Sequence, residues 1–356
     1  MLPCGTYNAT YAKDMAIVRT KTQWGLTIGG LILLFCLPLF TPSSILSILI
    51  IMGITIISVH GLNILTGLCG QLNFGQAAFM GVGAYTCAYL MIQGIPWPVA
   101  LICGALMSGL IGLVFGLPSL RLKGFYLAMA TIAAQFILSY TFVHLTKFTR
   151  GSLGLAVPIV HVGDIALKSE ASLFWLIMAF MVIMTFFAKN IMRTRAGRAF
   201  VAIRDNDLAA EILGINLTYY KCLAFFVCCF YAGVAGSLWA FYFHVLVPEH
   251  FTFMDSIWQV GMLIVGGMGS TLGVMLGVVF IRVISEGIAV LSPKLASIFP
   301  QVGGGMGGAT GGSFFIALGS MLFGLIIILF LIYEPRGLAH RWEIFKATYR
   351  LRPFPY

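Results

Sequence analysis

The sequence contains few charged residues. Asp, Glu, Lys and Arg make up 9% of its 356 residues and 60% are apolar, whereas a typical soluble domain has roughly 25% charged residues. So few charges cannot cover the surface of a soluble fold, which excludes an ordinary soluble enzyme, a disulfide-stabilised secreted domain and a disordered protein. The remaining class is an all-α, polytopic integral membrane protein. Since a helical span takes about 20 apolar residues, we expect about ten transmembrane helices and only small aqueous segments.

Signatures of catalysis and of metal binding are also missing. The sequence has no HExxH, GxSxG or GxxxxGK[ST] motif, so it lacks the usual patterns of zinc proteases, α/β-hydrolases and nucleotide-binding loops. Most of the eight cysteines lie in apolar runs without metal-ligand spacing, where cysteine acts as a small hydrophobic residue. We therefore expect a chain that is not an enzyme and needs no cofactor or metal, with any ATP hydrolysis on partner chains.

Apolar runs of suitable length recur along the chain. They fall near 24–40, 45–62, 76–93, 98–118, 125–145, 171–188, 219–247, 257–268, 272–291 and 313–333. The pair within 257–291 is cramped, which allows either two short spans or one span plus a re-entrant piece. Small residues also recur every four positions at Gly104, Ser108, Gly112 and Gly116. Such a stripe favours close packing of helices in lipid.

The basic residues predict the topology. They cluster at 13–21, at Arg121 and Lys123, at 189–204 and from Arg336 to Arg352. With ten spans all of these clusters lie on one side, as the positive-inside rule requires. The net charge of +10 therefore indicates cytoplasmic loops and no nucleic-acid partner. We expect a cytoplasmic N-terminal segment at 1–23, a transmembrane domain at 24–333 and a cytoplasmic basic tail at 334–356.

Ionisable residues within the spans are rare. Arg282 and Glu286 are four residues apart, so they can face each other on one helix as an intramembrane ion pair, either structural or in a translocation path. No carboxylate stands alone in the middle of a span, which counts against a proton- or sodium-coupled carrier.

The segment 61–76 joins two apolar runs but is polar. It contains Asn63, Gln71, Asn73 and Gln76 among several glycines. Uncharged amides at membrane depth must find partners or line a wet cavity, and glycines permit a broken helix. These four residues therefore predict either the lining of a translocation path or gate, or a turn that satisfies its own polar groups.

The longest hydrophilic loop contains a short helix signal. In the loop at about 190–218, Asp207 can cap a helix, Leu208 to Leu213 can form it, and Gly214 can end it. Leu208, Ile212 and Leu213 give it an apolar face. A helix of two turns is unstable alone in water, so it must dock either on its own membrane domain or on a cytoplasmic partner.

Several segments resemble a known family. Residues 61–85, 121–135, 196–225 and 265–278 are similar to ABC-importer permeases for branched-chain amino acids, specifically the longer, M-type subunit. The resemblance implies that 190–218 is the loop that couples to the ATPases, with Arg198, Arg204 and Glu211 as polar contacts beside the apolar face and Gly214.

The resemblance also implies the remaining parts of the transporter. These are a second, H-type permease subunit, two cytoplasmic ATPases, a periplasmic amino-acid-binding protein and the lipid of a bacterial inner membrane. Related permeases for urea, short amides and aromatic acids share the scaffold, so the substrate stays open. A stand-alone secondary carrier is the other transport alternative. An intramembrane enzyme needs a polar catalytic set in the spans, and the sequence has none.

Overall fold

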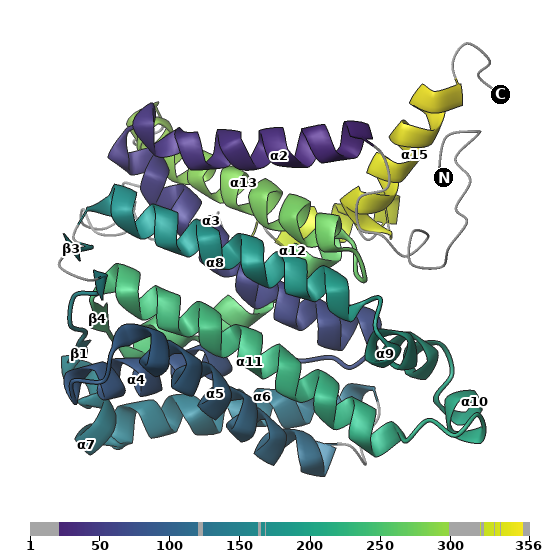
Figure 1. Ribbon diagram of the computed structural model, residues 1–356, viewed down its shortest axis with the longest axis horizontal. Coiled ribbons are helices and arrows are strands. Elements are labelled where there is room, and N and C mark those ends of the chain that lie inside the picture. The colour runs from purple at the N-terminus through teal and green to yellow at the C-terminus, as the bar shows by residue number, and fades with distance from the viewer. Residues whose placement is uncertain are drawn as a thin grey trace. The chain divides into compact units, whose positions relative to one another are not determined.

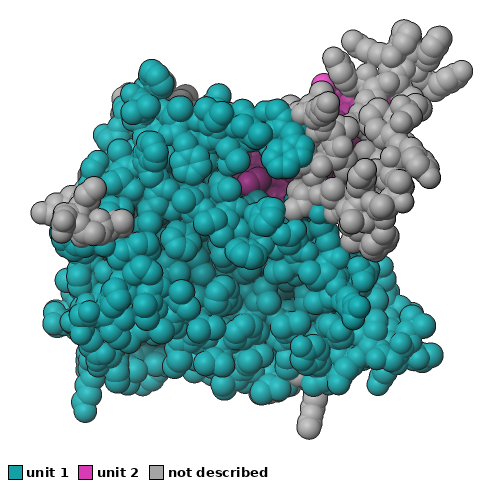
Figure 2. Space-filling model, in the orientation of Figure 1, with its two compact units in different colours: residues 1–257 teal, residues 258–356 magenta. Residues whose placement is uncertain are grey.

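The computed structural model describes residues 21–119, 124–162, 165–167, 169–298, 321, 324–330, 332–334 and 336–351. The chain forms two compact units, residues 1–257 and 258–356 (Figure 2). Each is described on its own below.

Unit 1 is built almost entirely of helices. In chain order they are α2 (Lys21–Cys36), η1 (Leu37–Leu39), α3 (Ser43–Leu62), the π-helical segment η2 (Asn63–Leu68), α4 (Gln76–Ile92), α5 (Trp97–Ser119), α6 (Phe125–His144), α7 (Thr146–Thr149), η3 (Gly151–Leu153), α8 (Glu170–Ile191), α9 (Arg195–Asp205), α10 (Asp207–Ile212), α11 (Leu217–Phe243) and η4 (Pro248–Phe251). Two antiparallel strand pairs complete it. β1 (Leu155–Ala156) pairs with β4 (Val245–Leu246), and β2 (His161–Val162) pairs with β3 (Ile165–Ala166).

Helix α11 packs against α3, α4 and α5 in the core of unit 1. Small residues bring these backbones close together. A Cβ added to Gly83 of α4 would lie 2.5 Å from the carbonyl oxygen of Gly233 on α11, so only glycine fits there. The Ser108 hydroxyl of α5 lies 2.8 Å from the carbonyl oxygens of both Phe79 and Cys229. The predicted packing role of the α5 stripe is therefore confirmed.

The non-spanning elements of unit 1 lie at opposite ends of its helices. Figure 1 shows α9 and α10 at one end, and α7 with the β1–β4 pair at the other. Helix α8 ends at the first of these ends and α11 begins there, so the loop between them lies at that end of unit 1.

The predicted 257–291 pair forms two separate helices, α12 (Phe253–Gly266) and α13 (Thr271–Ile298). The boundary between the two units falls within α12, and unit 2 also contains α15 (Gly337–Leu351). The turn between α12 and α13 uses glycines with positive φ, 108° at Gly267 and 84° at Gly269. The 14 residues of α12 span about 21 Å, which is short for a hydrocarbon core of roughly 30 Å. The choice between a short span and a re-entrant piece for this pair stays a prediction.

Six helices in the described part of the chain are long and apolar enough to cross a membrane. They are Ser43–Leu68, Trp97–Leu117, Phe125–His144, Glu170–Ile191, Leu217–Phe243 and Thr271–Ile288. Two apolar helices, Thr27–Leu39 and Gln76–Ile92, are shorter. Residues 1–20, Arg121, Lys123, the glycine-rich stretch 303–312 and most of 313–333 lie outside the described residues. The all-α, multi-pass membrane fold is confirmed, and the count of ten spans stays a prediction.

Candidate functional site

The loop between α8 and α11 folds into two short helices. Helix α9 begins after Thr194, whose hydroxyl accepts a hydrogen bond from the backbone N–H of Gly197. It ends at Asp205, and the extended Asn206 starts α10 with its side-chain oxygen on the N–H of Ala209, at 3.1 Å. The cap is thus Asn206 and not the predicted Asp207, which occupies the first helical position. Asn and Asp cap equally well, so sequence alone places this boundary only to within one residue.

Helix α9 docks on its own membrane domain. Ala199, Phe200 and Ile203 are buried, and the ring of Phe200 meets that of Tyr220 edge-on. Helix α9 thus places its apolar side chains against the base of α11. The sequence did not predict this helix, because the docking alternatives concerned only the helix at 207–213.

Helix α10, in contrast, leaves most of its apolar side chains exposed. Leu208, Ile212 and Leu213 are 64%, 86% and 79% exposed, whereas Ala210 is buried and anchors the helix. Gly214 ends it with a φ of 84°, as predicted. Three exposed aliphatic side chains on one short helix in a polar loop form a surface suited to burial against another protein. We call Leu208, Ile212 and Leu213 the apolar patch of α10.

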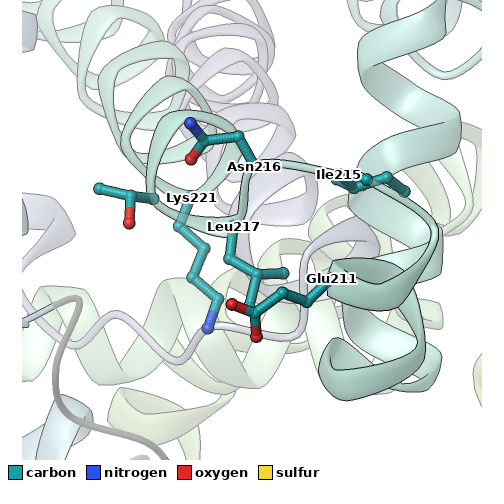
Figure 3. Close-up of a pocket in the computed structure, with 7 residues that line it drawn as sticks. Glu211, Ile215, Asn216, Leu217 and Lys221 are labelled. Carbon is teal, nitrogen blue, oxygen red and sulfur yellow. The ribbon is translucent and has the colours of Figure 1, made fainter.

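Charged residues surround a pocket beside this patch. The side chains of Glu211 and Lys221 extend into this pocket (Figure 3). The rest of its wall is formed by Gly214, Ile215, Asn216, Leu217 and Thr218. The Lys221 ammonium lies 3.9 Å from the Asp207 carboxylate, which ties α10 to α11. Arg198 is exposed and donates to the carbonyl oxygen of Arg193. The patch therefore has a polar rim that includes Glu211.

Arg204 points the other way, into the membrane domain. Its guanidinium donates a hydrogen bond to the carbonyl oxygen of Gly67 in η2, at 2.8 Å, and also binds the neighbouring Asp205 at 3.1 Å. The loop and the polar break at 63–76 are thus in direct contact. Sequence analysis placed both segments but not this connection, because they are separated by more than one hundred residues.

The polar break is a real interruption of the helical structure. Helix α3 continues into η2, residues 69–75 are non-helical, and α4 begins at Gln76. Asn63, Gln71, Asn73 and Gln76 are all buried. The Thr66 hydroxyl donates to the Gln71 carbonyl oxygen at 2.9 Å, which satisfies one backbone group freed by the break.

Asn73 and Gln76 belong to one buried hydrogen-bond network. The Asn73 oxygen accepts from the N–H of Gly75 at 2.9 Å, and its amide donates to Gln76 at 3.1 Å. The Gln76 amide donates to the carbonyl oxygen of Ser58 at 3.0 Å, and the Cys228 thiol donates to the Gln76 oxygen at 3.2 Å. The oxygen of Gln71, in contrast, has no hydrogen-bond partner among the described residues.

The sequence did not single out the residues that hold the first turn of α4 beside this network. Gln135 on α6 accepts a hydrogen bond from the N–H of Ala78 and donates to the carbonyl oxygen of Phe251. Ser256 on α12 accepts from the N–H of Ala77 and donates to Gln135. The available signal was a polar residue within an apolar run, since a buried polar side chain in a membrane protein needs a partner.

The predicted intramembrane pair lies on α13. Arg282 and Glu286 are both half-buried and one helical turn apart. Their spacing places them on the same face of α13 in unit 2, and the ion pair itself stays a prediction. No group of three or more His, Cys, Asp or Glu side chains able to hold a metal occurs within the described ranges.

The chain is similar to curated permeases. It is 28% identical to the high-affinity branched-chain amino acid transport system permease protein LivM of Salmonella typhimurium over 303 residues, which are 78% of this chain and 66% of that protein. It is 27% identical to the LivM protein of Escherichia coli over 87% of this chain and 73% of that protein. The probable LivM protein of Methanocaldococcus jannaschii is 24% identical over 67% of each chain. The chain thus spans just under two thirds of the Salmonella relative.

The family comparison covers most of the chain. No solved structure matches the chain. A family model described as branched-chain amino acid transport system, permease component, matches residues 44–331. That range includes the polar break, the loop between α8 and α11, and the helices that connect them. The chain therefore belongs to the family of permease components of branched-chain amino acid transport systems.

Proposed function

We propose that this chain is the M-type membrane subunit of an ABC importer for branched-chain amino acids. As a permease component it is a transport subunit and not an enzyme, and ATP is hydrolysed on partner chains. The observation that carries the proposal is the exposed apolar patch of α10, a surface suited to a cytoplasmic ATPase. The two LivM relatives are permeases for branched-chain amino acids, which supports the choice of substrate.

The proposed assembly contains a second, H-type permease subunit, two cytoplasmic ATPases and a periplasmic amino-acid-binding protein in a bacterial inner membrane. The N-terminal segment 1–23, the loop 190–218 and the tail 334–356 face the cytoplasm, and 24–333 forms the permease domain. The one-sided basic clusters support this topology. The placement of α9 and α10 opposite the strand pairs of unit 1 is consistent with it.

Transport would follow from a change of shape at the cytoplasmic end. Closure of the ATPases on ATP moves α10, and the membrane helices shift between inward-open and outward-open states. We place the solute path beside the polar break, where the amide oxygen of Gln71 has no partner within the described part of the chain. A zwitterionic amino acid needs only weak, transient contacts from the path, because high affinity can reside on the binding protein.

The ATPase contact is tested by placing a charge in the apolar patch. Leu208→Asp or Ile212→Asp should weaken binding of the ATPases about 10- to 100-fold, because a buried aliphatic side chain contributes about 1.5–3 kcal/mol. The measurement is co-purification of the ATPases with the membrane complex. Leu153→Asp is the matched control, since Leu153 is 92% exposed on η3, at the other end of unit 1. Full co-purification of Ile212→Asp would contradict the coupling role.

Substrate choice needs a separate measurement. Proteoliposomes that hold the complete importer should take up leucine, isoleucine or valine only with ATP and binding protein. Urea, short amides and aromatic acids serve as competitors, and efficient competition by one of them would reassign the substrate class. Uptake by the permease without the ATPases would instead indicate a stand-alone carrier.

A further inference from the structure

The side chain of Arg204 connects the loop that carries α10 to the polar break. Its guanidinium lies 2.8 Å from the carbonyl oxygen of Gly67. Gly67 is next to the last residue of η2, where carbonyl groups lack partners within the helix. A cation at a helix C-terminus is also favoured by the helix dipole. Arg204 therefore caps the helix that precedes the break, although it belongs to a different segment of the chain.

A second contact involves the first turn of the break. Gly70 has a φ of 72°, and a Cβ added there would lie 2.9 Å from Cγ and 3.4 Å from Cβ of Arg204. The aliphatic part of the arginine thus packs directly against the Gly70 backbone. Arg204 therefore contacts the chain on both sides of Leu68, where the helical structure ends.

The position of Arg204 in its own helix is also firm. It lies in the last turn of α9, next to the buried Ile203. Asp205 binds the guanidinium at 3.1–3.2 Å, which limits its rotation. Only Asp205 and Asn206 separate Arg204 from α10. A displacement of α10 therefore reaches this arginine through a short segment of two residues.

We propose that Arg204 transmits the movement of α10 to the polar break at residues 67–75. This inference rests on the proposed function, in which α10 binds an ATPase. Arg204 acts here as a positioning residue, because it moves the segment that lines the path without contacting solute. Loss of its side chain should separate ATP hydrolysis from transport and leave the ATPases bound, since the apolar patch of α10 remains intact.

The first experiment compares substitutions within α9 in the complete importer. Arg204→Ala should co-purify with the ATPases, keep basal hydrolysis within twofold and lose at least tenfold in ATP-driven uptake. Arg204→Lys should recover part of the uptake, because an ammonium still donates to the Gly67 carbonyl. Arg195→Ala is the control, since Arg195 is an exposed arginine on the same helix and should behave like wild type.

The second experiment replaces the lost contact with a covalent bond. The 3.4 Å between the two Cβ positions is close to the roughly 3.5–4.5 Å of a disulfide. In a background without the eight native cysteines, Arg204→Cys alone should be uncoupled. Adding Gly70→Cys strains the backbone at its φ of 72°, so the comparison is made within this double variant. Oxidation should raise its ATP-driven uptake, and a reducing agent should lower the uptake again.

The possible failures are distinguishable. Arg204→Ala complexes that transport like wild type would overturn the inference and leave the ATPase contact standing. Equal loss of thermal stability, ATPase binding and uptake in Arg204→Ala would show a purely structural role and also overturn it. If the wild-type chain itself binds no ATPases, the proposed function fails before the arginine is tested.

Discussion

The side-chain amide of Gln76 donates a hydrogen bond to the backbone carbonyl oxygen of Ser58, at 3.0 Å. This bond joins the first residue of α4 to α3, on the other side of the polar break. Both residues are fully buried. With Asn73 and Cys228 on its oxygen, the Gln76 carboxamide uses both its donor and its acceptor within the fold.

The first prediction distinguishes a structural role of the buried amides from a role in lining the solute path. Gln76→Leu should lower the free energy of unfolding by about 1–3 kcal/mol, because it leaves buried polar partners unsatisfied. Gln71→Leu removes an oxygen without a partner among the described residues, so stability should change little while uptake falls. Thermal unfolding in detergent and initial uptake rates measure the two effects. Unchanged uptake in Gln71→Leu would remove this residue from the path.

The second prediction concerns the end of α10. An added Cβ at Gly214 meets no atom within 4 Å, so space does not require glycine there. The backbone conformation, with a φ of 84°, is what favours glycine there. A β-branched residue adopts this conformation only at a cost of about 1–2 kcal/mol. Gly214→Val should therefore reduce the coupling of hydrolysis to uptake. Gly214→Asn is the matched control, since Asn tolerates positive φ, and equal behaviour of both variants would contradict the argument.

The third prediction concerns the contact between α4 and α11. A Cβ at Gly236 would overlap the carbonyl group of Met80. Gly236→Val should force the helices apart and lower the free energy of unfolding by about 1–3 kcal/mol. Gly29→Ala on α2 serves as the control because nothing lies within 4 Å of that position. The measurement is the thermal unfolding midpoint in detergent, and a drop as large for Gly29→Ala would argue against the packing explanation.

The fourth prediction concerns topology. Single cysteines at Ile212 and Leu153, which are 86% and 92% exposed, should react with an impermeant thiol reagent from opposite sides of the membrane. Leu153→Cys should be labelled in intact cells, and Ile212→Cys only after permeabilisation. The background must lack the eight native cysteines. Labelling of Ile212→Cys in intact cells would reverse the topology.

Sequence analysis located the short helix of the loop because its signals are local. A capping side chain, an Ala-rich turn and a terminal glycine all act within a few residues, so α10 was predicted to within one residue of its start. The same holds for the polar segment 61–76, where amides and glycines interrupt apolar runs and where residues 69–75 are non-helical. The span count was harder, because α12 has the composition of a span and only 14 residues in helix.

The sequence by itself determined that the chain is an all-helical membrane protein, where its helix is broken, and which short helix its longest hydrophilic loop contains. Composition and local capping are sufficient for these features. Only the tertiary structure decided that α9 is buried while α10 is exposed, that Gln76 binds Ser58, and that Arg204 binds Gly67. The physical reason is that these contacts depend on which helices pack together, and the small residues of α4, α5 and α11 set that packing through backbone distances that no local pattern records.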